Sequence, residues 1–314
     1  MEKTSDAVPE DIQMETLLRM PLKSLASIVR TKQFRDLYLL RSLTKPRVLF
    51  VDIPFRRDVL FHSVHQEEEP LLSSGQQQFQ VRVDQETEYG FSHFTRDPRD
   101  RNWLQIRSQG AKEHLHQVLT VGSGEESWRR IKCKHPHSPV TLGICKEGVL
   151  YYGARSNGDK SLVMSFDVRS EEFSVIELLP EGVNIHPRCN LVNYNGEIAL
   201  VDKDDAEFIR VTDSNGNGVF EMWVRKETTG KWWRNRIEIP RWEETAENMD
   251  YFFKGTIGTG ELVFARDHVI QRPFSVLYYD TVTHKIRRFQ IQGAGGQLRT
   301  VQTFLDHVDT TFLI

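Results

Sequence analysis

Beyond about residue 90, short hydrophobic runs alternate with polar turns in a pattern that recurs along the chain. VMSFDV, FEMWVR and SVLYYD lead into the turns DVRSEEF (167–173), KETTGKW (226–232) and DTVTHKI (280–286), and alternating runs such as FSVIEL, WWRNRIEI and IRRFQI follow. Each of these segments opens a polar turn and reaches a large hydrophobe six positions later, as also in DPRDRNW (97–103) and GSGEESW (122–128). Because a period of two is typical of half-buried strands, we expect β-hairpins.

A second hairpin precedes each of the three clearest ones. EGVLYYG, NGEIALV and TGELVFA place Gly148, Gly196 and Gly260 at tight turns, and these glycines are 48 and 64 residues apart. Two hairpins make a four-stranded unit of the size of a kelch-type propeller blade. The pattern predicts full units over residues 141–180, 189–240 and 251–292, and a degenerate unit over 91–133.

The segment from Pro46 to Glu88 carries the strand-like runs PRVLFVDIP, DVLFHSV and FQVRV, which predict a fifth, irregular unit. A strand from the other terminus is needed to avoid an open edge, and Val301–Val308 is the candidate. The Gln-, Glu- and Ser-rich stretch within 62–90 favours a long loop or linker. We therefore expect a mainly β fold of propeller-like, four-stranded blades, in a ring that need not be complete. A two-sheet β-sandwich is the alternative.

Residues 8–28, VPEDIQMETLLRMPLKSLASI, instead predict a small N-terminal α segment of two short amphipathic helices. Pro9 suits a first helical position, and Ile12, Leu17 and Met20 can share one apolar face. Pro21 ends this helix and can begin a second one, in which Leu22, Leu25, Ala26 and Ile28 are apolar. The segment is either a docking element for another protein or a helical cap on the main domain.

Composition narrows the function classes. The 314 residues include 41 basic and 44 acidic side chains, so the formal charge of −3 gives no drive toward nucleic acid. No apolar run is long enough for a membrane span and no signal peptide is evident, which favours cytoplasm or nucleus. The three cysteines, Cys133, Cys145 and Cys189, lack C-x-x-C spacing and are most simply buried thiols.

Several motifs imitate chemical sites. Asp213, Asn215 and Asn217 resemble the start of a calcium loop, but Val224 occupies the position that requires a bidentate Glu. The H-x-H pairs His114/His116 and His135/His137 could hold a metal, yet no acidic or cysteine ligand is next to the first pair and Pro136 interrupts the second. We expect no metal and no cofactor.

Catalytic motifs are equally weak. The chain has no nucleophile elbow, phosphate-binding glycine loop or H-E-x-x-H, and paired acids such as Glu171-Glu172 and Glu243-Glu244 fall in turns or solvated segments. We therefore expect no enzyme; a propeller enzyme or sugar-binding protein is the weakest alternative. Trp232 and Trp233 are adjacent, so one can enter the core of the sheet while the other is exposed for contact with a partner.

Two resemblances extend this interpretation. P-E-D-I and L-L-R-M-P-L-K-S-L resemble the first two helices of the F-box in the large plant F-box families, while the third element, of the form C-V-S-K-x-W, is missing after Ile28. The resemblance implies docking on a Skp-type adaptor, and through it a cullin. The adaptor-binding residues that it implies are Pro9, Ile12, Leu17, Met20, Pro21, Leu22 and Leu25.

HQVLTVGSGEESWRRIKC, GVLYYGA, SFDVRSEEFSVI, LVNYNGEIALV, GTGELV and TFLDHV are similar to the type-3 F-box-associated domain of plant proteins. We expect a truncated F-box-like segment (1–30), a connecting segment (31–90) and a propeller-like domain (91–314). The resemblance implies the substrate-recognition subunit of a Skp–cullin–F-box ubiquitin ligase that binds an unknown target protein. The alternative is a stand-alone interaction module, or a degenerate copy, that no longer binds the adaptor.

Overall fold

The computed structural model describes thirteen stretches of the chain, and almost all of them are antiparallel sheet. They are residues 47–54, 58–65, 77–82, 90–96, 103–109, 115–121, 128–176, 182–202, 215–247, 249–266, 268–269, 274–291 and 299–307. The expected N-terminal helical segment, residues 8–28, lies outside them.

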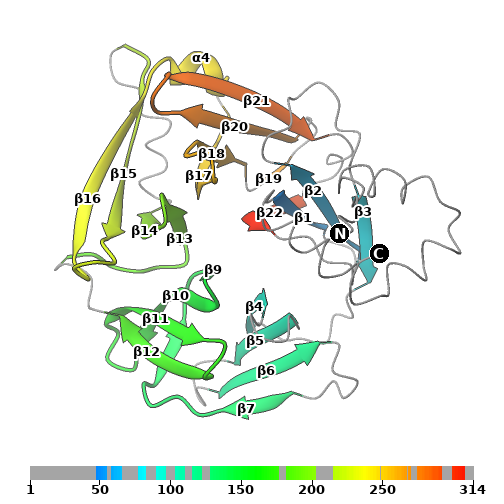
Figure 1. Cartoon of the computed structure of the whole chain (residues 1–314), viewed down its shortest axis with the longest axis vertical. Coiled ribbons are helices and arrows are strands. Elements are labelled where there is room, and N and C mark those ends of the chain that lie inside the picture. The colour runs from blue at the N-terminus through cyan, green and yellow to red at the C-terminus, as the bar shows by residue number, and fades with distance from the viewer. Residues whose placement is uncertain are drawn as a thin grey trace, which may run out of the picture.

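The described strands form five sheets around a common centre (Figure 1). Three of them are four-stranded meanders in simple chain order. The first is β4 (Gly90–Arg96), β5 (Trp103–Gln109), β6 (Leu115–Val121) and β7 (Arg129–Ile131). The second is β13 (Cys189–Tyr194), β14 (Glu197–Asp202), β15 (Gly218–Arg225) and β16 (Trp232–Ile239). The third is β17 (Phe252–Thr256), β18 (Leu262–Ala265), β20 (Phe274–Asp280) and β21 (Lys285–Ile291).

The fourth sheet departs slightly from this plan. Strand β10 (Val149–Ser156) pairs with two short strands, β8 (His137–Pro139) and β9 (Ile144–Lys146), and then β11 (Ser161–Asp167) and β12 (Glu172–Ile176) follow. All four expected units between residues 91 and 292 are therefore present as sheets. The propeller-like prediction is confirmed, and the described strands do not form the two-sheet β-sandwich of the alternative.

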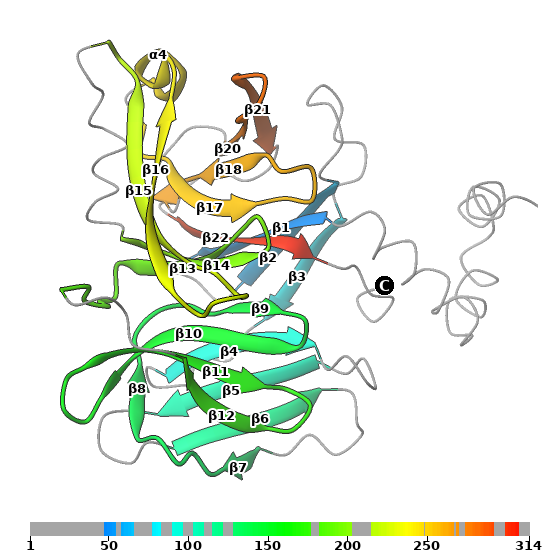
Figure 2. The ribbon, with the colours of Figure 1, turned by 60° about the vertical axis from the view of Figure 1, so that its left-hand side comes forward.

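The fifth sheet joins strands from both ends of the described chain. Strand β22 (Arg299–His307) lies between β19 (His268–Val269) and β1 (Arg47–Pro54), and β2 (Asp58–His65) and β3 (Gln77–Arg82) complete the sheet. Figure 2 shows β22 alongside β1. The expected closing strand is thus confirmed. Strand β3 (Gln77–Arg82) agrees with the strand-like run FQVRV expected for the fifth unit and replaces part of the expected polar loop. The domain boundary at residue 91 stays a prediction.

Local turn chemistry explains why the hairpins form. Glu147-Gly148 and Asn195-Gly196 have positive φ at both residues, which suits the two-residue turns β9–β10 and β13–β14. In the turn after β20, the carboxylate of Asp280 accepts hydrogen bonds from the backbone N–H groups of Val282 (2.8 Å) and Thr283 (3.3 Å). Asp167 makes the same contacts after β11.

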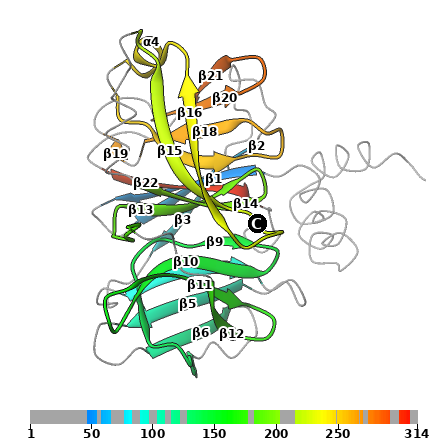
Figure 3. The same ribbon diagram turned by 90° about the vertical axis from the view of Figure 1, so that its left-hand side faces the viewer.

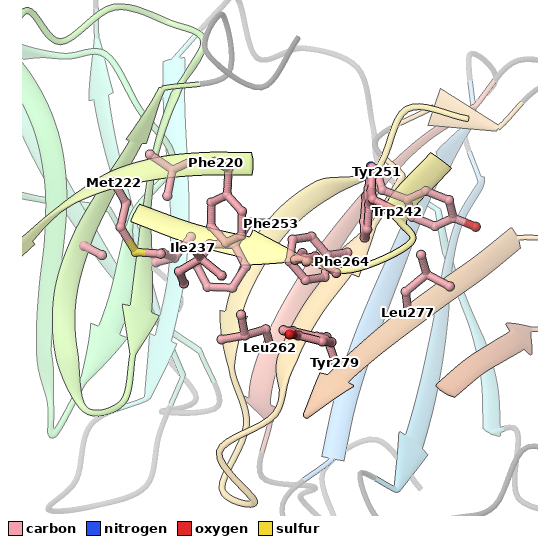
Figure 4. Packing of buried hydrophobic residues seen from close by; sticks show 14 of the residues in the cluster. Phe220, Met222, Ile237, Trp242, Tyr251, Phe253, Leu262, Phe264, Leu277 and Tyr279 are labelled. Atoms are coloured by element: carbon pink, nitrogen blue, oxygen red, sulfur yellow. The ribbon is translucent and has the colours of Figure 1, made fainter. Parts of the chain in front are cut away.

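The largest core cluster lies between the β13–β16 and β17–β21 sheets (Figure 4). Phe220, Phe253 and Phe264 form a triangle with ring centroids 5.1 to 5.5 Å apart. The short helix α4 (Trp242–Ala246) adds Trp242, whose ring centroid is 5.1 Å from that of Phe264. The two sheets are therefore held by interlocking aromatic side chains, whose burial is the dominant stabilising term in such a core.

Inner strands of successive sheets also touch. Strand β10 contacts β13, β13 contacts β17, and β17 contacts β22, an order that runs around the centre in Figure 1. Figure 3 shows β10, β13 and β17 one above the other from a side. At the β13–β17 contact, the hydroxyl of buried Thr256 accepts a hydrogen bond from the backbone N–H of Asn195 (2.7 Å) and donates one to the carbonyl of Asn193 (3.3 Å). These contacts connect four of the five sheets near the centre.

Candidate protein-binding surface

The seven residues expected to bind the adaptor all lie outside the described part of the chain. They are Pro9, Ile12, Leu17, Met20, Pro21, Leu22 and Leu25. Their role stays a prediction, and a candidate binding surface among the described residues must lie on the β domain.

The β15–β16 hairpin carries the most exposed tryptophan on the described surface. Its turn begins at Lys226, whose carbonyl accepts a hydrogen bond from the N–H of Gly230 (2.7 Å). The N–H of Lys226 donates a hydrogen bond to the carbonyl of Lys231 (2.9 Å). Gly230 has a φ of 68°, a conformation that glycine adopts without strain. The turn is thus a defined structure, set by local sequence.

Neighbouring strands hold this turn from two directions. A carboxylate oxygen of Glu197 on β14 accepts a hydrogen bond from the backbone N–H of Glu227 at 2.8 Å. Lys146, on β9 of the adjacent sheet, donates from Nζ to Glu227 Oε2 at 2.6 Å, and this hydrogen bond lowers the pKa of Glu227. The turn therefore has an anchor in each of two sheets.

The adjacent tryptophans after the turn divide as expected. Trp232 packs against the cluster that contains Ile185 and Leu200, whereas Trp233 remains 42% exposed. Trp233 pairs with Val224, and Lys231 is hydrogen-bonded to Lys226 two positions nearer the turn. Because directly opposed residues and alternate residues share a face of a sheet, Trp233, Lys226 and Lys231 lie on one face.

We call Trp233, Lys226 and Lys231 the Trp233 surface. All three are exposed, and the two lysines put positive charge beside a large aromatic ring. On the opposite face of β16, Arg234 is paired with Glu221. An exposed tryptophan beside cations fits contact with a protein that offers an apolar pocket and acidic side chains.

Among the described residues, some members of the motifs considered for catalysis and calcium make structural contacts. Glu171 pairs with Arg129 across two sheets, and Glu243 and Glu244 are exposed in the first turn of α4. Asn217 donates to Glu238 (3.1 Å) and accepts from the N–H of Arg241 (3.2 Å), so it joins β15 to the start of α4. Asp213 lies outside the described residues.

The structure changes the interpretation of the cysteines and histidines. Cys189 is buried as expected, but Cys145 is exposed, because the short strand β9 is at the surface, and Cys133 is half-buried. His116 and His137 belong to different H-x-H pairs, yet their rings stack at 4.6 Å and ligand atoms of Cys133 lie within 4.8 Å of theirs. Sequence spacing missed this grouping because the three residues come from separate strands and a connection.

In the part of the chain that the structure describes, no helix has both the length and the apolar character needed to cross a membrane.

Comparison with known proteins assigns the sequence of this chain to a family. Residues 73–308 match the F-box associated beta propeller domain. The F-box protein At1g70960 of Arabidopsis thaliana is 41% identical over 374 aligned positions, which cover 98% of each chain. F-box protein At1g70970 is 40% identical, covering 97% of each, and F-box/kelch-repeat protein At3g04660 is 28% identical, covering 99% of this chain and 94% of its own; both are also from Arabidopsis thaliana.

The first of these alignments also bears on length. It spans 374 positions, whereas this chain has 314 residues, so at least 60 positions are gaps in this chain (374 − 314). This difference in length agrees with the expectation that the chain is a shortened version of its relatives. From the domain match and the relatives together, the chain belongs to the plant F-box proteins that carry an F-box associated beta propeller domain.

Proposed function

We propose that this chain is the substrate-recognition subunit of a Skp–cullin–F-box ubiquitin ligase. The observation that carries the proposal is the match to F-box proteins along nearly the whole chain, together with the F-box-like sequence of residues 8–28. The N-terminal segment would bind a Skp-type adaptor and, through it, a cullin. The β domain would bind the target, and other subunits would perform ubiquitin transfer, so this chain needs no catalytic group or cofactor.

Positioning is sufficient for such a role. A receptor that holds adaptor and target on one chain raises the effective concentration of the target near the transfer machinery. The Trp233 surface supplies an aromatic anchor of the kind that carries much of the energy of protein interfaces. We place this work in the cytoplasm, the nucleus or both, and expect no nucleic-acid or membrane partner.

The test is a binding assay between the full chain and a purified Skp-type adaptor. Leu17→Asp/Leu25→Asp places two charges on the apolar faces of the expected helices and should abolish binding, because burying an unpaired carboxylate is costly. Ser24→Asp/Ser27→Asp adds two charges away from the apolar face of the expected second helix and should bind as wild type does. Failure of the folded wild-type chain to bind would refute the ligase role.

Target recognition needs a separate measurement. A target should be captured by the wild-type chain, lost with Trp233→Ala and retained with Val282→Ala, which truncates another exposed hydrophobe on a different sheet. Its abundance should also rise in cells depleted of the chain. Candidates that Trp233→Ala captures equally well would remove the Trp233 surface from the proposal.

A stand-alone interaction module is the second candidate. It is favoured by the missing third F-box element and by the gaps in the alignment with the relatives. In that case the chain would retain Trp233-dependent partners while showing no adaptor binding.

A further inference from the structure

Two imidazole rings and a thiol meet at the seam between the β4–β7 and β8–β12 sheets. His116 is on β6, His137 is on β8, and Cys133 lies in the connection between β7 and β8. Both histidines are 1% exposed, and one ligand atom from each of the three residues lies within 4.8 Å of the others. We call these residues the His116–Cys133–His137 cluster.

The spacing is close to that of a metal centre. Cys133 Sγ is 3.8 Å from His137 Nδ1. In tetrahedral zinc sites, bonds of about 2.0–2.3 Å separate neighbouring sulfur and nitrogen ligands by roughly 3.5 Å. Closing the cluster around an ion therefore needs shifts on the order of 1 Å. One of the two stacked rings must also turn, because their planes are only 22° apart and an imidazole nitrogen binds a metal in its own ring plane.

The groups that would orient the ligands are already in place. The hydroxyl of Tyr152 is 2.7 Å from Nε2 of His137, and the backbone N–H of His135 donates to Cys133 Sγ at 3.4 Å. Zinc-bound histidines almost always donate their second N–H to such a partner. A tyrosine hydroxyl can either donate or accept this bond.

We propose that the His116–Cys133–His137 cluster binds one Zn²⁺ ion and ties the two sheets together. The metal is held by Cys133 Sγ, by Nδ1 of His137 and by a ring nitrogen of His116. Water supplies the fourth ligand from the side on which Cys133 is half exposed. Two imidazoles and a thiolate suit a borderline-soft divalent ion.

Protons move in a defined way when the ion binds. Without metal, His137 Nδ1 donates to the carbonyl of His135 at 2.6 Å, and Nε2 accepts from Tyr152. With metal, the Cys133 thiol releases its proton to solvent and binds as thiolate. His137 carries its proton on Nε2 and donates it to the Tyr152 oxygen, which leaves Nδ1 to bind the ion.

A second group of three residues, His186, Cys189 and Asp202, also has metal-ligand spacing. Its hydrogen bonds instead indicate an ordinary His186–Asp202 pair. The N–H of Arg188 donates to His186 Nδ1 at 3.3 Å, so Nε2 carries the proton and donates to Asp202 at 3.0 Å. The Cys189 thiol is directed to the carbonyl of Asn184. Cys189 therefore serves as the control cysteine in the metal-binding test.

The test is a cobalt titration of the chelator-treated full chain, followed by displacement with zinc. Wild type should bind one Co²⁺ with a thiolate-to-cobalt charge-transfer band that zinc abolishes. Cys133→Ser should lose the band, while Cys145→Ser and Cys189→Ser should keep it. Tyr152→Phe should keep the band and weaken affinity by roughly 10–100-fold, as expected for a lost orienting partner.

A second readout needs no substitution at the site. Zinc should protect Cys133, and not the exposed Cys145, from alkylation as mapped by peptide mass spectrometry. Absence of stoichiometric binding, a band that survives Cys133→Ser, a band lost in Cys189→Ser, or binding of copper without zinc or cobalt would each overturn the proposal.

Discussion

Trp242 lies directly against Gly218: a Cβ atom at position 218 would come within 2.5 Å of Cγ of the indole. Gly218 begins β15 and Trp242 begins α4, so the close approach brings the helix onto the end of the sheet. Trp242 is 1% exposed and contributes to the largest core cluster. The absence of a side chain at Gly218 is what admits the ring.

Gly218→Ala should lower the free energy of unfolding by about 1–3 kcal/mol, because the added methyl overpacks the indole. Trp242→Ala should cost about 3–5 kcal/mol, and the double variant less than the sum, since removing the ring relieves the clash. Urea denaturation of the four proteins measures the coupling. Gly158→Ala, where the nearest atom is 3.9 Å from the added Cβ, is the control and should change stability little.

Trp232 and Trp233 should differ in stability although they are neighbours. Trp233→Ala removes an exposed ring and should alter the free energy of unfolding by less than about 0.5 kcal/mol. Trp232→Ala removes a ring packed against core residues and should cost about 1–3 kcal/mol. Thermal and urea melts of the two variants test this; equal losses would mean that the Trp233 ring is packed.

Thr256→Val should destabilise the chain by about 1–3 kcal/mol. The substitution keeps the shape of the side chain but removes the hydroxyl that bonds both Asn195 N and Asn193 O at the β13–β17 contact. Thr256→Ser retains the hydroxyl and should be closer to wild type. A serine variant as unstable as the valine variant would indicate that the methyl group, rather than the hydrogen bonds, matters there.

Asp280 should make stability depend on pH. Hydrogen bonds from the Thr283 hydroxyl and from the N–H of Val282 lower the pKa of this carboxyl below its ordinary value of 3.8. Because the folded-state pKa is the lower one, the stabilisation is present above pH 3.8 and is lost as the pH falls through the folded-state value.

Urea midpoints measured as the pH falls from neutral to below 3.8 should therefore drop more steeply for wild type than for Asp280→Asn, which cannot ionise. Thr283→Val removes the largest contributor to the shift and should give an intermediate slope. Parallel slopes for all three proteins would contradict the assignment.

Much of the fold could be predicted because hairpins are local. Alternating hydrophobicity and turn residues such as Asp280, Gly148 and Gly196 act over a few positions, so the strands and their grouping into units are readable from the sequence. The closing strand was also predictable, since an unpaired edge in the first unit requires a partner. Its register with β1 depends on the assembled sheets.

Contacts between sheets could not be predicted from local sequence patterns. The exposure of Trp233 rather than Trp232 depends on how far the neighbouring sheets extend over β16. Trp233 is exposed although it shares a face with the buried Ile237, and Trp232 on the other face packs against a second core cluster. Alternation alone defines the two faces without saying where along the strand each one is covered. The approach of Trp242 to Gly218 likewise depends on how the chain enters α4.

The sequence by itself determined the family resemblance, the β-hairpin units and the expected adaptor-docking residues, because these depend on local hydrophobic patterns and short sequence motifs. Only the tertiary structure decided that His116, Cys133 and His137 meet, since they lie on a seam between two sheets. Their proximity follows from the packing of Val118 and Ile131 against the β8–β12 sheet, a long-range burial that no local period encodes.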